Sequence, residues 1–184
     1  DPDALDAQYE GSDPCYTYAR ETHPNAEVLA GLSDALEGAS GGIVVGSGMA
    51  AISIALLGVL KAGDHVIGAD QLYGRSLRMM NEELPRLGIE TSLVDATDAN
   101  AVASALKPNT KLILIETLSN PTLRMADVSG ILALRARGVM VAVDNTFTTP
   151  VMFKPLEQGS DITIQSVTKM LAGQSDATLG YVAA

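Results

Sequence analysis

The strongest constraint on the fold is a regular alternation of short β-rich runs with helical segments. Strands are predicted at residues 43–45, 65–68, 91–94, 111–116, 139–144, 162–166 and 178–183. Helices are predicted between them at residues 49–61, 75–87, 100–106 and 128–137. Because parallel strands need long crossover connections, usually helical, this order predicts an α/β protein. Its seven-stranded, mainly parallel sheet should carry helices on both faces.

The last predicted strand differs from the others. Residues 178–183 follow residues 162–166 too closely for a long crossover helix between them. We therefore expect residues 178–183 to run antiparallel to the preceding strand.

The N-terminal segment is predicted to stand apart from this core. Residues 1–24 contain three prolines and little periodicity, which indicates an extended arm. Apolar side chains at helical spacing predict a helix over residues 25–36, and Gly38 would end it. We therefore divide the chain into an arm and helix at residues 1–40 and a core domain at residues 41–184.

Composition excludes several classes of function. A net charge of -10 without any basic run argues against a nucleic-acid partner. Cys15 is the only cysteine, so neither a disulfide framework nor a thiolate metal cluster is expected. His23 and His65 are not spaced as metal ligands, and no metal is predicted. Residues 43–60 are apolar but interrupted by Gly and Ser, which indicates a buried segment rather than a membrane span. Without a signal peptide at its start, the protein is expected in the cytoplasm.

Unusual residues follow five of the predicted strands. In an open α/β sheet, ligands bind beyond the carboxyl ends of the strands, so these residues should meet in one region. The five segments are Gly46-Ser-Gly-Met49, Asp70-Gln-Leu-Tyr-Gly74, Glu116-Thr-Leu-Ser-Asn-Pro121, Asp144-Asn-Thr-Phe147 and Ser166-Val-Thr-Lys169.

Lys169 stands after a strand with two hydroxyl residues close before it. Ser166 and Thr168 can donate hydrogen bonds to a phosphate, while the Lys169 amine reaches a carbonyl carbon. This combination suits a lysine that forms a Schiff base next to a phosphate anchor. A surface lysine in a loop is the alternative interpretation of Lys169 alone.

The turn at residues 46–49 has two interpretations as an anion site. Its glycines let a ligand approach the backbone, and the following helix N-terminus offers free N–H groups. The same turn spells G-x-G-x-x-A, with Asp70 at the end of the next strand, which by itself favours a dinucleotide such as NAD. A Gly-rich turn needed only for strand–helix packing is the third possibility.

Three further residues are ambiguous when each is taken alone. Asp144 ends an apolar run, where a carboxylate is costly unless it is paired, for example with a pyridinium nitrogen. It could instead cap a turn with Asn145 and Thr146. Tyr73 could stack on a flat ring or simply pack, and Asn120 could donate to a phenolate oxygen or form a turn before Pro121.

Together these motifs resemble a known family. The chain is similar to the pyridoxal-phosphate-dependent enzymes of cysteine and methionine metabolism, which include cystathionine γ-synthase, cystathionine lyases, methionine γ-lyase and homoserine sulfhydrylases. Beyond the strand-end segments, the matching motifs are Tyr18-Ala-Arg20, Gly63-Asp-His-Val66 and Gly173-Gln-Ser-Asp176. The resemblance implies an aspartate-aminotransferase-like (type I) large domain at residues 41–184.

The resemblance also implies a role for each matched residue. Lys169 would carry pyridoxal phosphate and move protons, Asp144 would pair with the ring nitrogen, and Tyr73 would stack on the ring; these three are the predicted catalytic residues. Asn120 would contact the ring oxygen. The other predicted cofactor-binding residues of the same subunit are Gly48, Met49, Thr146, Ser166 and Thr168. Tyr18 and Arg20 would reach the phosphate of a neighbouring subunit, which implies a homodimer or homotetramer.

The implied activity is β- or γ-elimination, or γ-replacement, on cystathionine-, methionine- or O-acylhomoserine-type amino acids. Relatives continue into a smaller C-terminal domain, whereas this chain stops at Ala184, so that domain is expected to be absent. An NAD-binding domain, and a cofactor-binding fragment without turnover, remain as alternatives.

Overall fold

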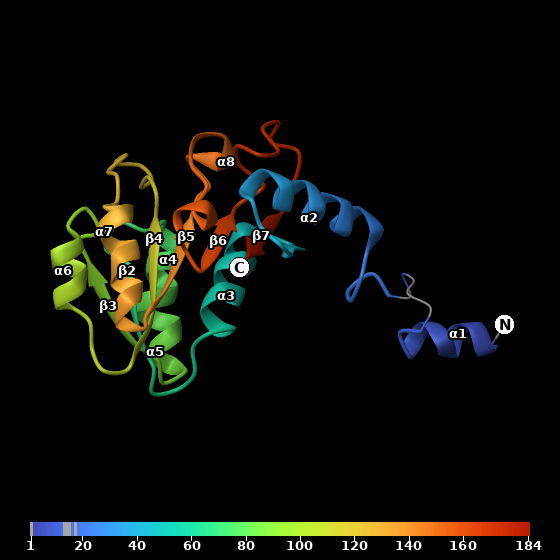
Figure 1. Ribbon diagram of the computed structural model, residues 1–184, viewed down its shortest axis with the longest axis horizontal. Coiled ribbons are helices and arrows are strands. Elements are labelled where there is room, and N and C mark those ends of the chain that lie inside the picture. Colours follow the sequence, from blue (N-terminus) through green and yellow to red (C-terminus); the bar gives the residue numbers. More distant parts are fainter. Residues whose placement is uncertain (1, 13–15, 17) are drawn as a thin grey trace.

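The computed structural model describes residues 2–12, 16 and 18–184, and Cys15 therefore lies outside the described residues. The described residues form one seven-stranded sheet in the order β1-β7-β6-β5-β4-β2-β3 (Figure 1). The strands are β1 Gly42–Val45, β2 His65–Ala69, β3 Glu90–Val94, β4 Thr110–Glu116, β5 Met140–Asp144, β6 Ile162–Gln165 and β7 Gly180–Ala183. All seven predicted strands are confirmed, with ends shifted by one or two residues.

The prediction for the last strand is also confirmed. β7 pairs antiparallel with β6 on one side and with β1 on the other. The remaining pairs, β2–β3, β2–β4, β4–β5 and β5–β6, are parallel. Strands β1 to β6 therefore share one direction, and their carboxyl ends lie at one edge of the sheet.

Helices cover both faces of the sheet, as expected. The connecting helices are α3 Gly48–Leu57, α4 Gly74–Arg78, a π-helical turn Met79–Glu83, α5 Leu84–Arg86, α6 Ala99–Ser104, α7 Val128–Ala133 and α8 Thr149–Met152, with 3₁₀ turns at Leu134–Arg137 and Leu156–Gln158. Crossovers between parallel strands are right-handed, which places α3 and α4–α5 on one face and α6, α7 and α8 on the other. The contacts of α3 with α4, and of α6 with α7, agree with this division.

The core lies around the two central strands. Residues 112–115 of β4 and 141–143 of β5 are almost completely buried apolar side chains. Such uninterrupted apolar runs are typical of parallel strands covered on both faces. Among the described residues, no helix combines the length and the apolar character that crossing a bilayer requires.

The N-terminal segment is only partly as predicted. Helix α2 spans Pro24–Glu37 and ends at Gly38, whose φ of 72° lies in the left-handed region that favours glycine. The expectation of an extended arm is wrong at the start of the chain, where α1 forms a helix over Pro2–Tyr9. Pro2 and the acidic Asp3 in the first turn favour the start of a helix. The prediction missed this helix because it relied on apolar periodicity, which residues 1–24 lack. Figure 1 shows α1 apart from the sheet.

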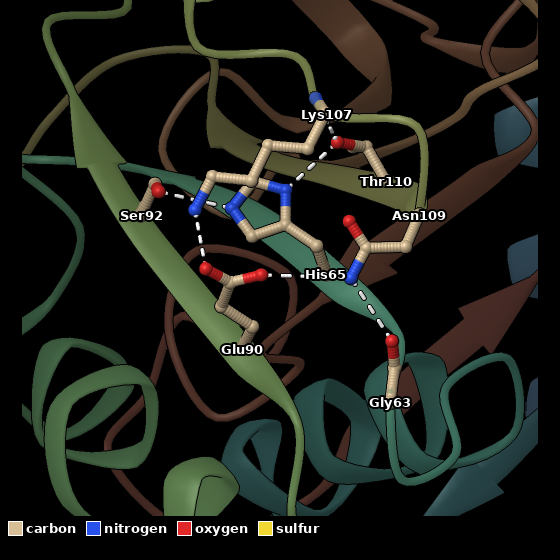
Figure 2. Close-up of polar contacts among 7 residues, drawn as sticks. All are labelled: Gly63, His65, Glu90, Ser92, Lys107, Asn109 and Thr110. Carbon is tan, nitrogen blue, oxygen red and sulfur yellow. Dashed lines mark hydrogen bonds and ion pairs between the residues drawn. The ribbon is translucent and has the colours of Figure 1, made fainter.

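A buried histidine joins three strands at the opposite edge of the sheet (Figure 2). His65, the first residue of β2, is completely buried. Its Nδ1 lies 2.7 Å from Thr110 Oγ1 on β4, and its Nε2 lies 2.9 Å from Ser92 Oγ on β3. Burial and the charge of Lys107 lower the pKa of His65. The neutral imidazole therefore fixes the register of β2 against both neighbouring strands.

Replacing His65 with phenylalanine is expected to lower the free energy of unfolding at pH 7 by about 1–3 kcal/mol, because the Thr110 and Ser92 hydroxyls each lose a hydrogen bond. The pKa is lowered in the folded state, so the unfolded state binds the proton more readily. Stability should therefore fall as the pH drops through about 6.5, and this part of the fall should be absent in the variant. Urea unfolding at pH 5 and pH 7.5 measures both effects.

The matched control is His23→Ala, which removes the other histidine, an exposed residue whose Nδ1 accepts the Asn25 N–H at the start of α2. Loss of this cap should lower stability by about 0.5–2 kcal/mol at both pH values. This control should keep the wild-type loss of stability at low pH. An unchanged pH dependence in His65→Phe would show that the buried imidazole does not contribute to it.

Candidate active site

A pocket of about 230 Å³ lies at the edge of the sheet where strands β1 to β6 end. Its walls come from the turn before α3, the start of α4 and the segments after β4, β5 and β6. The lining residues are Ser47, Gly48, Met49, Ile52, Tyr73, Glu116, Leu118, Asn120, Asp144, Thr146, Phe147, Ser166, Thr168 and Lys169. Every predicted site residue except Tyr18 and Arg20 therefore lines one pocket, although their individual roles stay predictions.

The turn between β1 and α3 forms one wall by close backbone approach. Ser47 caps the N-terminus of α3, where its Oγ accepts a hydrogen bond from the Ala50 N–H at 3.1 Å. A Cβ at Gly48 would lie 2.6 Å from the Cβ of Ser166, so any other residue would push the turn away from the loop after β6. A Cβ at Gly180 of β7 would overlap the Ser47 carbonyl group. The N-terminus of α3 thus meets the loop after β6 directly, which suits an anion between them.

The loop that carries Lys169 is held by hydrogen bonds on both sides. The Ser166 N–H donates to Thr146 Oγ1 at 2.8 Å, and the Lys169 N–H donates to the Ser166 carbonyl at 3.0 Å. Thr168 Oγ1 donates to the Leu179 carbonyl and accepts from the Leu179 N–H, both at 3.0 Å. The Thr168 hydroxyl therefore anchors its loop to the chain before β7, whereas the sequence had suggested only phosphate binding.

Asp144 provides a partly enclosed negative charge. Its Oδ1 accepts hydrogen bonds from the Thr146 N–H at 3.0 Å and from Thr146 Oγ1 at 2.5 Å. Burial raises the pKa of Asp144, and the Thr146 hydrogen bonds oppose that rise. The turn-capping interpretation is thus present in the structure. Both bonds end on Oδ1, which leaves Oδ2 to pair with a cation in the pocket.

Glu116 is a pocket residue that the sequence did not single out. It is the last residue of β4 and the register partner of Asp144 on β5. Its Oε1 accepts the Tyr73 main-chain N–H at 2.6 Å, and its Oε2 is buried without a partner among the described residues. Burial, followed by the nearby charge of Asp144, raises the pKa of Glu116 to about 7. The sequence feature that could have identified Glu116 as a site residue is its position at the end of a predicted strand, as for Asp144. Four other lining residues were also outside the predicted set: Ser47, Ile52, Leu118 and Phe147.

Tyr18 and Arg20 do not reach this pocket. Both side chains are exposed, and the Arg20 guanidinium carbon lies 5.1 Å from the centre of the Tyr18 ring, a cation–π distance. Neither residue lines the pocket of its own chain. The binding of Tyr18 and Arg20 to the phosphate of a neighbouring subunit therefore stays a prediction.

The geometry does not support the dinucleotide interpretation. Asp70 follows β2, but it is not among the described residues that line the pocket. The sheet also carries an antiparallel strand, β7, between β6 and β1, unlike the 3-2-1-4-5-6 order of dinucleotide-binding folds. The G-x-G-x-x-A turn here faces a lysine and two carboxyl groups.

The chain is similar to known proteins over nearly its whole length. Residues 3–184 match the family model of the Cys/Met metabolism PLP-dependent enzyme. The chain is 46% identical to cystathionine beta-lyase MetC of Bacillus subtilis over 91% of its own length and 43% of that protein. It is 43% identical to L-methionine gamma-lyase of Fusobacterium nucleatum over the same shares of each chain. The chain therefore spans less than half the length of these relatives.

Solved structures also match this chain. The structure of putative O-acetylhomoserine (thiol)-lyase from Campylobacter jejuni superposes with a TM-score of 0.91 at 30% identity, over 100% of this chain and 45% of that one. That structure contains N'-pyridoxyl-lysine-5'-monophosphate, a lysine joined to the cofactor. MetB from Corynebacterium glutamicum superposes with a TM-score of 0.89 at 36% identity, over 92% of this chain and 44% of that one. The predicted fold is thereby confirmed, and this chain belongs to the family of pyridoxal-phosphate-dependent enzymes of cysteine and methionine metabolism.

Proposed function

We propose that this chain is the cofactor-binding domain of an enzyme that eliminates or replaces the β- or γ-substituent of a sulfur-containing amino acid. The substrates would be of the cystathionine, methionine or O-acylhomoserine type. The observation that supports this best is the meeting of the Lys169 amine, the Gly48 turn and the Asp144 carboxyl in one pocket. The arm and helix at residues 1–40 and the core at residues 41–184 would be its two parts.

The residues present fit pyridoxal phosphate. The turn at Gly48 and Met49 would offer backbone N–H groups to a phosphate, and Ser166 would offer a hydroxyl. The absence of a Cβ at Gly48 lets this turn lie directly against Ser166, so that both reach the same part of the pocket. Asp144 would pair with the ring nitrogen through its remaining oxygen, since a partly buried carboxyl is best stabilised by a cation. Tyr73 would cover the ring, and Asn120 would contact its oxygen substituent. Thr146 and Thr168 would hold the segments that carry Asp144 and Lys169.

The chemistry divides between the cofactor and the protein. When bound, pyridoxal phosphate withdraws electrons from the α-carbon of the amino acid. Lys169 would hold the cofactor covalently through Nζ and afterwards use the same atom to move the α-proton. Asp144 would keep the ring nitrogen protonated by supplying a fixed negative charge beside it.

Assembly belongs to the same proposal. Tyr18 and Arg20 lie exposed outside the pocket of their own chain, and an arginine fork matches the oxygens of a phosphate bidentately. We place them at the phosphate of a neighbouring subunit in a homodimer or homotetramer, whose site would then be composite.

The function is tested by locating the covalent cofactor. Purified chain is mixed with pyridoxal phosphate, reduced with borohydride, digested and analysed by mass spectrometry. The adduct is expected on Lys169 rather than on Lys61, Lys107, Lys111 or Lys154, which are the other lysines. An adduct distributed over those four would contradict the proposal. Specific modification of Lys169 without turnover of any sulfur amino acid would instead indicate a cofactor-binding unit alone.

A further inference from the structure

Glu116 joins two segments of the pocket that are distant in sequence. Helix α4 begins at Gly74, and its preceding residue, Tyr73, provides no side-chain cap of its own. The Glu116 carboxyl, from β4, accepts the Tyr73 main-chain N–H at 2.6 Å. A side chain at the end of β4 thus holds the residue that precedes α4.

The Tyr73 ring depends on that main-chain anchor. Its side chain is 46% exposed and lines the pocket. Among the described residues, the Tyr73 hydroxyl has no hydrogen-bond partner, so no polar contact fixes the ring at its far end. No side-chain hydrogen bond therefore competes with the backbone at Tyr73 in directing the ring, and Glu116 holds that backbone.

The surroundings of Glu116 explain why a titratable group can serve this purpose. Asp144 on β5 and Lys169 after β6 are the other charged pocket residues, and the N-terminus of α4 lies against Oε1. A second full negative charge beside Asp144 is unfavourable in a buried site. The unpartnered Oε2 is an atom that can carry a proton, while Oε1 continues to accept the Tyr73 N–H.

We propose that Glu116 is a positioning residue, whose carboxyl fixes the main chain of Tyr73 so that the Tyr73 ring lies over the cofactor pocket. The proposal rests on the proposed function in one respect, because the ring is taken to cover pyridoxal phosphate. The position of the ring in the chain without cofactor tests Glu116 independently.

The chain contains no tryptophan, so Tyr73→Trp creates a single fluorescent reporter at this position. Glu116→Ala and Glu116→Gln are each combined with this reporter. Glu116→Ala removes the acceptor for the Tyr73 N–H, whereas Glu116→Gln keeps an acceptor oxygen and removes the titration. The matched control is Glu83→Ala, an exposed glutamate in the same helical segment.

The measurements are reporter anisotropy without cofactor and the Kd for pyridoxal phosphate from quenching of the reporter. Glu116→Ala should lower the anisotropy and weaken cofactor binding by about tenfold, the usual cost of losing one hydrogen bond to a charged group. Glu116→Gln should restore both to within about twofold. The Glu83→Ala control should match the parent in both measurements.

A pH series separates positioning from a merely structural role. An ionised carboxylate accepts the Tyr73 N–H more strongly than a neutral acid does. The reporter signal of the Glu116 protein should therefore titrate with a midpoint of about 7, and Glu116→Gln should show no such step. If Glu116→Ala does not fold, as judged by circular dichroism, the Gln variant decides alone, and a step at the same pH in that variant would overturn the proposal. Parent-like anisotropy and Kd in a folded Glu116→Ala would overturn it as well. If no variant binds pyridoxal phosphate, the proposed function fails, whereas the anisotropy without cofactor still tests Glu116.

Discussion

Replacing Lys169 with alanine is expected to abolish covalent attachment of pyridoxal phosphate. Among the described residues, Lys169 is the only lysine that lines the pocket. Ser166 and the Gly48 turn line the same pocket. The phosphate contacts would remain, so the variant should still bind the cofactor reversibly, with a weaker Kd. Turnover should fall by at least about 10²–10⁴-fold, because the group that moves the α-proton is lost as well.

Absorption spectroscopy and borohydride reduction followed by mass spectrometry distinguish the two kinds of binding. Lys111→Ala is the matched control, because Lys111 is exposed near the amino end of β4, at the opposite edge of the sheet. It should retain the adduct in full. An adduct that survives in Lys169→Ala and disappears in the control would show that the cofactor is held at another place.

Asp144→Asn is expected to separate stability from activity. The asparagine oxygen can still accept the two hydrogen bonds from Thr146, so the turn should persist. Burial raises the pKa of Asp144 in the folded state, so folding gains nothing from its ionisation, and stability is lost as the pH rises from about 4 through that raised pKa. The variant should therefore be at least as stable as the parent at pH 7.

In contrast to stability, turnover should fall in Asp144→Asn. Without a fixed negative charge beside the ring nitrogen, the rate should fall by about 10²–10³-fold, a typical effect of losing one preorganised electrostatic group. Thermal unfolding and steady-state kinetics are measured on the same preparations. The comparison outside the pocket is Asp161→Asn, which changes a half-buried carboxyl paired with Arg135. Turnover near that of the parent in Asp144→Asn would rule out the proposed pairing.

Periodicity and position within the chain were enough to predict the sheet. The seven strands, the antiparallel β7 and the helix α2 all follow from apolar runs, connection lengths and a terminal glycine. Because ligands bind at the carboxyl ends of strands, the sequence also predicted that residues from these ends would meet. One pocket indeed contains residues from four strand ends and from the start of α4.

The parts that escaped prediction depend on distances in space. The role of Glu116 requires its register with Asp144 and an N–H group 43 residues away in sequence, at Tyr73. The Thr168 hydroxyl bonds to Leu179, which only the course of the chain before β7 brings near. Tyr18 and Arg20 cannot be placed from one chain if their ligand lies in another, because no contact within the chain specifies it.

The position of β7 also bears on the order in which this protein can assemble. Strand β1 joins the sheet only through β7, so the sheet is incomplete until residues 180–183 have been synthesised. During synthesis the turn after β1 therefore leaves the ribosome long before the strand that pairs with β1. Until that time β1 has no strand partner among the described residues, and the strongly apolar helix α3 follows it directly. About 130 residues separate β1 from β7, the strand with which it pairs. Contacts between segments so distant in sequence slow folding and leave apolar surface exposed until they form.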